Sequence, residues 1–527
     1  MYDLLIKNAE VIDGTGNPRQ KADVAVKDGK IRMASGTEEA QTVIDGTGRI
    51  LCPGFIDVHS HGDLVAGHDY ARLCKTSQGI TTEVAGQCGN SFFPVLPETA
   101  EAVMSNALML GELEEKHMKE FRGQKEFADF LGKQSLSANM MTFMGHSTLR
   151  LLAMGSSDAR PDRKQMKYME ETLKESMEEG CAGLSTGLFY PPSAYGNVEE
   201  VSGLCAVAAR YGGIHTTHMR NEGAGILDSV KEVLEISRRS GIALNISHHK
   251  ICGKKNRGLS EQTLELADEA RKEGIQVTMD VYPYTASMTK LAACIPAEYF
   301  VKGTDWLQNA LRGKETRRQI REKMETFEDG RYLQCGGFSG IMIGGCPSRP
   351  DADGRFLSEY AAETGEDPFD VFFDLVTENG SRCSAIYFSM DEEDLEHIIR
   401  WPYTMIGTDG LTVSMNGKTH PRSWGTFPRA LRIFVKEKKI LSMEEMIRRM
   451  TGLPAETYHM TSRGRIADGY AGDLVLFDEA QIRDQADYSD SCRLSSGICC
   501  VAVDGKIVYR DGKMTGEFPG KWVPFRG

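Results

Sequence analysis

The segment Gly54-Phe55-Ile56-Asp57-Val58-His59-Ser60-His61 is an apolar run that ends in two histidines two positions apart. Because side chains alternate between the two faces of a strand, His59 and His61 are expected to project to the same side. Neutral imidazole is a common ligand of zinc, iron and nickel. A lone histidine is more often an ordinary core or surface residue, but this pair predicts half of a metal site at a strand end.

Seven further apolar, β-rich segments follow along the middle of the chain, and amphipathic segments separate them. The eight predicted strands cover residues 54–61, 81–87, 139–146, 181–189, 213–220, 243–250, 276–284 and 401–409. Strands that alternate with helices are typical of a (β/α)8 barrel of the α/β class, whose sites lie at the carboxyl ends of the strands. The sequence therefore predicts a TIM-like (β/α)8 barrel.

Short strands and turn signals such as Asp28-Gly29 and Asp504-Gly505 recur at both ends of the chain. We expect them to form one small β-sandwich from residues 1–53 and 466–527, with the barrel over residues 54–465. The connection between the seventh and eighth predicted strands is far longer than usual. We expect part of it, residues 286–348, to be an insertion that folds as a lid over the barrel mouth.

The composition narrows the class of protein. Hydrophobic residues make up 40% and charged residues 26% of the 527 residues, as in ordinary soluble globular proteins. The net charge of -13 argues against a nucleic-acid or anionic-membrane partner. We find no signal-peptide pattern and no apolar run of the roughly 18 residues that a transmembrane helix needs. With thirteen scattered cysteines, this favours a cytoplasmic protein that acts on a small molecule.

Three more candidate ligands lie at the ends of predicted strands. They are Cys88, His218 and His248. Cys88 lies in a glycine-rich loop, and the two histidines end consecutive strands, which are neighbours in a barrel. With the first histidine pair, these residues offer five ligands, enough for one tight zinc site and a second, weaker one. The adjacent His249 points to the opposite face and is expected to be a bystander.

Asp409 is the candidate catalytic residue. It ends the last predicted strand, within Gly407-Thr408-Asp409-Gly410, and would face the metal across the barrel mouth. A carboxylate there can accept the proton of the attacking water and return it to the leaving amine. An Asp-Gly pair is also a common turn, so the position at a barrel strand end is what favours the catalytic interpretation.

The opening segment, with its flanking β segments, resembles the amidohydrolase superfamily. Finer motifs resemble one branch of it, the N-acyl-D-amino-acid deacylases (D-aminoacylases). These motifs are GQCG at 86–89, STGLFYPP at 185–192, THMRNE at 217–222, SHHK at 247–250, DVYPY at 280–284, GTDG at 407–410 and HPRSWGTFPR at 420–429. The resemblance covers nearly the whole chain. It implies hydrolysis of an N-acyl-D-amino acid to a carboxylate and a free D-amino acid.

The resemblance also implies zinc as the cofactor and a role for each matching residue. Cys88, His218 and His248 would hold the tight zinc, with the cysteine bridging towards a weaker site at His59 and His61. Asp409 would be the general acid and base. The residues expected to bind substrate are Arg422, Lys250, Tyr282, Tyr190 and Ser287. The first of these would grip the α-carboxylate as a bidentate fork.

Two other reactions of the superfamily remain open, namely cyclic-amide hydrolysis of the hydantoinase or dihydroorotase type and deamination. Cyclic-amide enzymes commonly bridge two metals through a carboxylated lysine. The fourth predicted strand contains Ser185-Thr186-Gly187 towards its end and has no lysine there. Deaminases usually carry a His-x-x-Glu arrangement, whereas Glu222 follows His218 one residue later. A non-catalytic scaffold would require a missing ligand or base, and the sequence lacks neither.

Overall fold

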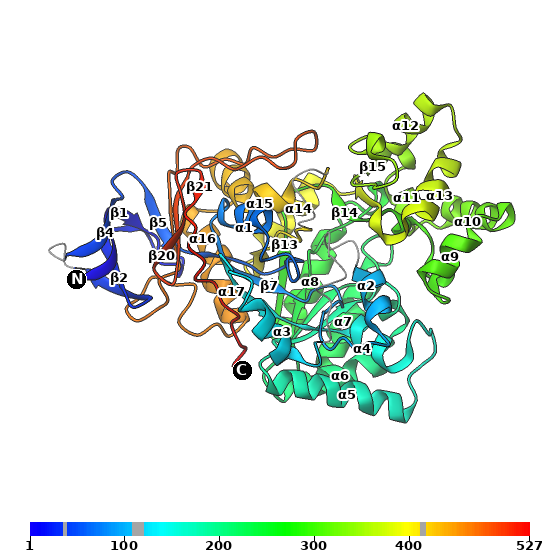
Figure 1. Cartoon of the computed structure of the whole chain (residues 1–527), viewed down its shortest axis with the longest axis horizontal. Helices are drawn as coiled ribbons and strands as arrows, with labels where there is room; N and C mark the ends of the chain where they lie inside the picture. Colours follow the sequence, from blue (N-terminus) through cyan, green and yellow to red (C-terminus); the bar gives the residue numbers. More distant parts are fainter. Residues whose placement is uncertain (35–38, 108–120, 412–417) are drawn as a thin grey trace.

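The computed structural model describes residues 1–34, 39–107, 121–411 and 418–527 of the chain. Strands from the two chain ends lie together at one end of the molecule, and a mainly helical lobe lies at the other (Figure 1). Between them, alternating strands and helices form the central part that positions the candidate site.

The central part is a barrel of parallel strands. Its strands are β6 (Phe55–Asp57), β7 (Ile80–Ala85), β8 (Asn139–Thr142) with its continuation β9 (Met144–Gly145), β10 (Gly183–Gly187), β11 (Ile214–His218), β12 (Ala243–Ile246), β13 (Val277–Val281) and β17 (Thr404–Ile406). One sheet runs β17-β13-β12-β11-β10-β9 and the other β6-β7-β8, and β8 and β9 join the two. A parallel bridge between Ser60 and Gly410 connects β6 to β17. Each predicted strand overlaps one of these, and the predicted barrel fold is confirmed.

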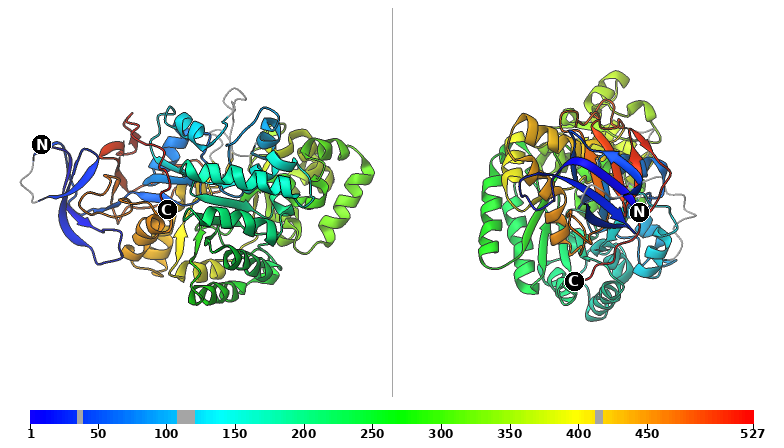
Figure 2. Two further views of the ribbon diagram at one scale, coloured as in Figure 1. Left: turned by 90° about the horizontal axis from the view of Figure 1, so that it is seen from below. Right: turned by 90° about the vertical axis from the view of Figure 1, so that its left-hand side faces the viewer.

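Helices cover the outside of the barrel strands (Figure 2). They include α1 (Asp69–Thr76), α3 (Gln124–Leu131), α4 (His146–Met154), α5 (Arg163–Glu178), α6 (Val198–Ala209), α7 (Ile226–Ser240), α8 (Leu259–Lys272), α14 (Glu392–Arg400), α15 (Arg422–Ala430), α16 (Met443–Met450) and α17 (Gly452–Thr457). Met169 and Leu173 of α5 are fully buried in the barrel core, as their helical spacing predicts. Within the described residues, no helix combines the length and apolarity needed to cross a membrane.

Strands from both chain ends form one nine-stranded sheet. They are β1 (Tyr2–Val11), β2 (Gln20–Lys27), β3 (Lys30–Ala34), β4 (Ala40–Asp45), β5 (Ile50–Pro53), β18 (Leu474–Phe477), β19 (Ile498–Val503), β20 (Lys506–Arg510) and β21 (Lys513–Met514). Ile50 and Cys52 pack against the barrel, whereas Leu51 packs with the apolar side chains of the first strands. This alternation lets both faces of β5 be buried. The division into domains at residues 1–53 and 466–527 stays a proposal.

The chain between β13 and β17 forms the lobe at the far end of the molecule (Figure 1). Its elements include β14 (Ser287–Lys290), α9 (Thr304–Ala310), α10 (Lys314–Thr326), α11 (Arg331–Gln334), β15 (Ile341–Ile343), α12 (Leu357–Thr364), α13 (Pro368–Asn379) and β16 (Ser384–Tyr387). One apolar core extends from Leu291 to Tyr387, and β16 is the central strand of the lobe's sheet. The lobe therefore continues well beyond residue 348, where we expected the insertion to end. That it acts as a lid stays a proposal.

Candidate metal centre

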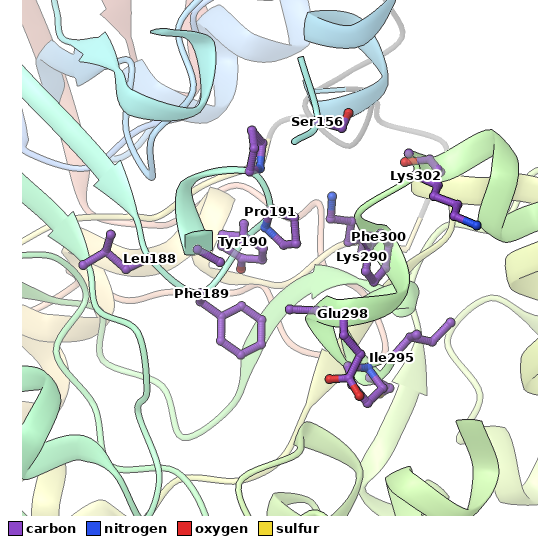
Figure 3. Close-up of a pocket in the computed structure, with 18 of the residues that line it drawn as sticks. Ser156, Leu188, Phe189, Tyr190, Pro191, Lys290, Ile295, Glu298, Phe300 and Lys302 are labelled. Carbon is purple, nitrogen blue, oxygen red and sulfur yellow. The ribbon is translucent and has the colours of Figure 1, made fainter. Parts of the chain in front are cut away.

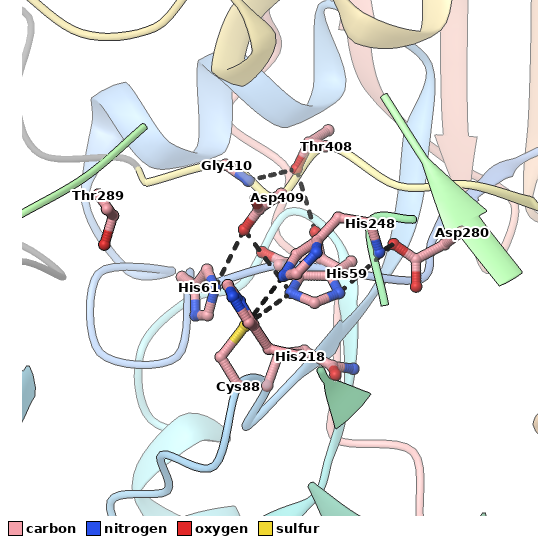
Figure 4. Close-up of polar contacts among 12 residues, drawn as sticks. His59, His61, Cys88, His218, His248, Asp280, Thr289, Thr408, Asp409 and Gly410 are labelled. Carbon is pink, nitrogen blue, oxygen red and sulfur yellow. Dashed lines mark hydrogen bonds and ion pairs between the residues drawn. The ribbon is translucent and has the colours of Figure 1, made fainter. Parts of the chain in front are cut away.

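Six predicted site residues converge at the carboxyl ends of the barrel strands (Figure 4). They are His59, His61, Cys88, His218, His248 and Asp409. The Sγ atom of Cys88 lies 3.4 Å from Nε2 of His59, 3.4 Å from Nε2 of His248 and 3.9 Å from Nδ1 of His218. Oδ1 of Asp409 lies 3.2 Å from Nε2 of His61 and 3.6 Å from Nε2 of His59. All six side chains are buried.

These residues form two overlapping groups that share Cys88. One group contains His59, His61, Cys88 and Asp409, and the other contains Cys88, His218 and His248. Within each group, one donor atom of every residue lies within 4.8 Å of the others. This is the arrangement expected of two neighbouring metal positions with a bridging thiolate.

The backbone turns unusually at three of these residues. Cys88, His248 and Asp409 have φ values of 54°, 34° and 47°, in the left-handed region that L-residues seldom adopt. Such a conformation costs about 1–2 kcal/mol per residue. Beside Cys88, a Cβ at Gly86 would clash with the carbonyl of Phe143, so only glycine allows this close approach. The strained turns bring side chains from separate strands to one point.

The charges of the donor groups suit a zinc ion. Burial raises the pKa of the Cys88 thiol, but the positive charges of His59 and His248 outweigh it and bring this pKa well below its usual value. Burial lowers the pKa of His218 to about 4, so its imidazole is neutral. Burial opposes ionisation of Asp409, but Arg422 and the nearby histidines hold its pKa well below its usual value. Thiolate, neutral imidazole and carboxylate are the donors that zinc prefers.

The first histidine pair is protonated more readily. Burial opposes the positive charge of His61, but Asp409 and Cys88 raise its pKa to about 9. A metal at this position therefore has to displace a proton. The pKa of His248 is also raised, so the histidine pKa values do not separate the two positions, and the division into one tight and one weaker site stays a proposal.

Glu222 and Asp280 orient the imidazoles from behind. Oε1 of Glu222 lies 3.3 Å from Nδ1 of His248, and Oε2 lies 3.6 Å from Nε2 of His218. Oδ1 of Asp280 lies 3.4 Å from Nδ1 of His59. Each of these nitrogens is the one that faces away from Cys88, so the carboxylates act on the outer side of the rings. The sequence analysis assigned no role in the site to either acid. Glu222 follows His218, the last residue of β11, by four positions.

A buried charge network lies beneath the centre. Nζ of Lys75 lies 2.7 Å from Asp57 and 3.0 Å from Glu83. Asp57 also accepts hydrogen bonds from the backbone N–H and the hydroxyl of Thr408, at 2.8 and 2.6 Å. The network therefore joins β6 to the segment that carries Asp409.

Four of the five expected substrate-binding residues line a small cavity at the centre. They are Arg422, Lys250, Tyr190 and Ser287. Nη1 of Arg422 lies 2.7 Å from Oδ2 of Asp409, and its Nε is buried without a hydrogen-bond partner among the described residues. Tyr282 lies outside this cavity, where its ring contacts the guanidinium of Arg422 at 4.7 Å. Its Oη atom is buried without a hydrogen-bond partner among the described residues, and its expected role in substrate binding stays a proposal.

Arg331 is a cavity residue that sequence reasoning missed. It begins α11 in the lobe and lines the same cavity. Its Nη1 lies 3.5 Å from Oγ of Ser287, its Nη2 lies 3.6 Å from Glu222, and its guanidinium stacks over Phe189 at 4.5 Å. The lobe has no recognisable motif, so the sequence offers no signal for this residue.

A second cavity of about 840 Å³ lies next to the small one (Figure 3). The barrel contributes Phe189 and Tyr190, and the lobe contributes Ile295 and Phe300. Three residues line both cavities, namely Tyr190, Lys290 and Arg331. The centre is thus continuous with a space large enough for a substantial substituent of a ligand.

The model of the amidohydrolase family matches residues 42–311 and 366–509. The chain belongs to the amidohydrolase family. It is 35% identical to the N-acyl-D-glutamate deacylase of Alcaligenes xylosoxydans xylosoxydans, over 96% of this chain and 93% of that protein. It is 33% identical to the D-aminoacylase of the same organism, over 99% and 97%.

Among solved structures, this amidohydrolase resembles the N-acyl-D-glutamate deacylase of Bordetella bronchiseptica in complex with zinc and a phosphonate inhibitor. The TM-score is 0.85 at 34% identity, and the match covers 100% of both chains. These findings confirm the resemblance to the N-acyl-D-amino-acid deacylases that the motifs indicate.

Proposed function

We propose that this amidohydrolase hydrolyses N-acyl-D-amino acids to a carboxylate and a free D-amino acid. The observation that carries the proposal is the position of Asp409 between two functional groups. Its carboxylate lies 3.2 Å from the imidazole of His61 and 2.7 Å from the guanidinium of Arg422. A hydrolytic centre thus adjoins a group suited to bind the carboxylate of an amino-acid substrate. The names of the deacylase relatives support the same substrate class.

Zinc is the cofactor of this proposal, with a tight site at Cys88, His218 and His248 and a weaker one at His59 and His61. The thiolate and the neutral imidazole described above support this assignment. When bound, zinc polarises the amide carbonyl and lowers the pKa of water. The similar Bordetella enzyme was solved with zinc.

The protein's own residues supply binding and proton transfer. Arg422 and Lys250 hold the substrate's α-carboxylate, and Tyr282 supports the guanidinium of Arg422. Asp409 takes a proton from the attacking water and returns it to the leaving nitrogen. An α-carboxylate bound to Arg422 neutralises the charge that depresses the pKa of Asp409. Substrate binding therefore makes Asp409 a better base.

We place this reaction in the cytoplasm and give it no nucleic-acid or membrane partner. The thirteen cysteines of the chain all carry free thiols in the structure, and the net charge is -13. Both features favour a reducing compartment and a small-molecule substrate.

A panel of matched N-acetyl-D- and N-acetyl-L-amino acids with apolar, acidic and basic side chains tests the proposal. Release of the free amino acid is measured, with ammonia release followed in parallel. We expect hydrolysis of D members, no ammonia, and zinc in the purified protein by metal analysis. Opening of a hydantoin or dihydroorotate ring, or ammonia release from a base, without hydrolysis of any D member would replace this function by one of the alternative reactions.

A further inference from the structure

Lys290 is a cation at the junction of the two cavities. It ends β14 and lines both the small cavity and the larger one. Figure 3 shows its side chain in the larger cavity near Phe300. Its other neighbour is the ring of Tyr190, whose centre lies 6.0 Å from Nζ.

No carboxylate of the described residues forms an ion pair with Lys290. Two other cations of the larger cavity have such partners, since Lys323 pairs with Glu298 and Arg220 with Glu232. Burial without an anion lowers the pKa of Lys290 to about 8. The Lys290 side chain is half-buried, and a cation that lies between two cavities without an anionic partner among the described residues is suited to bind an anion.

No acidic residue is among the described residues that line both cavities. Of the three residues that line both cavities, Lys290 and Arg331 are cations and Tyr190 is neutral. The acidic residues of the larger cavity do not line the smaller one; they are Glu98, Glu101, Glu298, Asp305 and Asp329. Among the described residues that line the smaller cavity, Asp409 is the one carboxylate, and Arg422 pairs with it.

Lys290 is also separate from the group that we assign to the α-carboxylate. Nη2 of Arg422 donates to the carbonyl oxygen of Met288, two residues before Lys290 along β14. Two residues of a strand span about 7 Å. Arg422 and Lys290 therefore meet β14 at different positions, and the larger cavity leaves room for a second negative group of the substrate.

We propose that the junction of the two cavities binds a second anionic group of the substrate, with Lys290 as the residue that selects for it and Arg331 beside it. The group is carried either by the D-side chain or by the acyl moiety. This inference rests on the proposed function and narrows its substrate class to N-acyl-D-amino acids with a second negative charge.

Two isosteric pairs of substrates test the inference. N-acetyl-D-glutamate is compared with N-acetyl-D-glutamine, and N-succinyl-D-leucine with its succinamyl amide. In one of the two pairs we expect the charged substrate to have a kcat/KM at least tenfold above that of its neutral partner. A preference in the glutamate pair places the D-side chain at Lys290, and a preference in the succinyl pair places the acyl group there. Equal or better hydrolysis of both neutral members overturns the inference but leaves the proposed function intact. No hydrolysis of any D member overturns both.

Variants connect the preference to Lys290. Lys290→Met is expected to raise KM for the charged substrate about 10- to 100-fold through loss of a charged hydrogen bond, with kcat and the neutral substrate little changed. Lys290→Arg should retain the preference. The matched control is Lys302→Met, because Lys302 lines only the larger cavity and stacks over the half-exposed Trp306. An unchanged charged-to-neutral ratio in Lys290→Met contradicts the assignment.

Discussion

Glu222→Gln is expected to weaken zinc binding without touching a predicted ligand. The Glu222 carboxylate lies behind two candidate ligands, 3.3 Å from Nδ1 of His248 and 3.6 Å from Nε2 of His218. It also accepts a hydrogen bond from Nζ of Lys250 at 2.5 Å. One carboxylate thus lies next to both rings and pairs with a buried cation.

The tautomer of His248 explains the direction of the effect. Nε2 of His248 faces Cys88, so it must present its lone pair to a metal, and Nδ1 must then carry the hydrogen. Glu222 can accept that hydrogen. Lys250, however, has its Nζ 2.7 Å from the same Nδ1, and a donor there favours the opposite tautomer. Loss of the negative charge leaves Lys250 unpaired and shifts the balance toward the form that does not bind metal.

The magnitude follows from the long contacts. Outer carboxylates of this kind are worth about 10- to 100-fold in metal affinity. Glutamine still offers one acceptor, and the distances of 3.3 and 3.6 Å are longer than ideal charged hydrogen bonds. We therefore expect the dissociation constant for zinc to rise about tenfold to thirtyfold, which corresponds to about 1.4–2 kcal/mol.

Competition with a chromophoric chelator measures zinc affinity, and thermal unfolding of the metal-free protein checks the fold. Glu232→Gln is the matched control, because Glu232 holds Arg220 on the flank of the barrel at 2.9 Å. Unchanged zinc affinity in a folded Glu222→Gln protein would refute the argument that this carboxylate fixes the imidazoles.

Three further predictions follow from the same contacts. Asp409→Asn should lower kcat about 10²- to 10⁴-fold in an assay of deacylation, because the asparagine amide cannot transfer the proton. The bound zinc should be retained. Lys75→Met should lower the free energy of unfolding in urea by about 3–5 kcal/mol, because two buried carboxylates lose their cation. The advantage of a charged over a neutral substrate should decline as pH rises through about 8, where the free Lys290 ammonium loses its proton. Tyr190 has its pKa raised to about 12 by burial, and Arg331 stays charged, so neither titrates in this range.

Each of these outcomes has a contrary result. Near-normal turnover by Asp409→Asn would remove that residue from proton transfer. Lys167→Met is the control for Lys75, because Lys167 is exposed and its pair with Glu171 is 3.5 Å long. Equal stability of the two variants would contradict the buried network. A charged-to-neutral ratio that stays flat from pH 7 to 9 would contradict the part given to Lys290.

Strand periodicity was sufficient to predict most of the candidate centre. The alternation rule places His248 and His249 on opposite faces, and Nε2 of His249 indeed lies 2.8 Å from Thr263, away from Cys88. Barrel geometry brings the strand ends together, so residues far apart in the chain were expected to meet. The ends of short parallel strands are thus among the features that local sequence patterns predict best.

The features that the sequence did not predict depend on tertiary packing. Arg331 reaches the cavity from a lobe whose position depends on its own apolar core, and nothing local in the sequence encodes that placement. The left-handed turn at Cys88 depends on the space that Gly86 leaves beside Phe143, which is a contact between two strands. Both are tertiary effects. The candidate metal ligands therefore follow from the ends of the barrel strands. The proposed selection of substrate depends on the lobe, which no strand pattern describes. Lys290 and Arg331 are the lobe residues that lie next to the candidate metal centre.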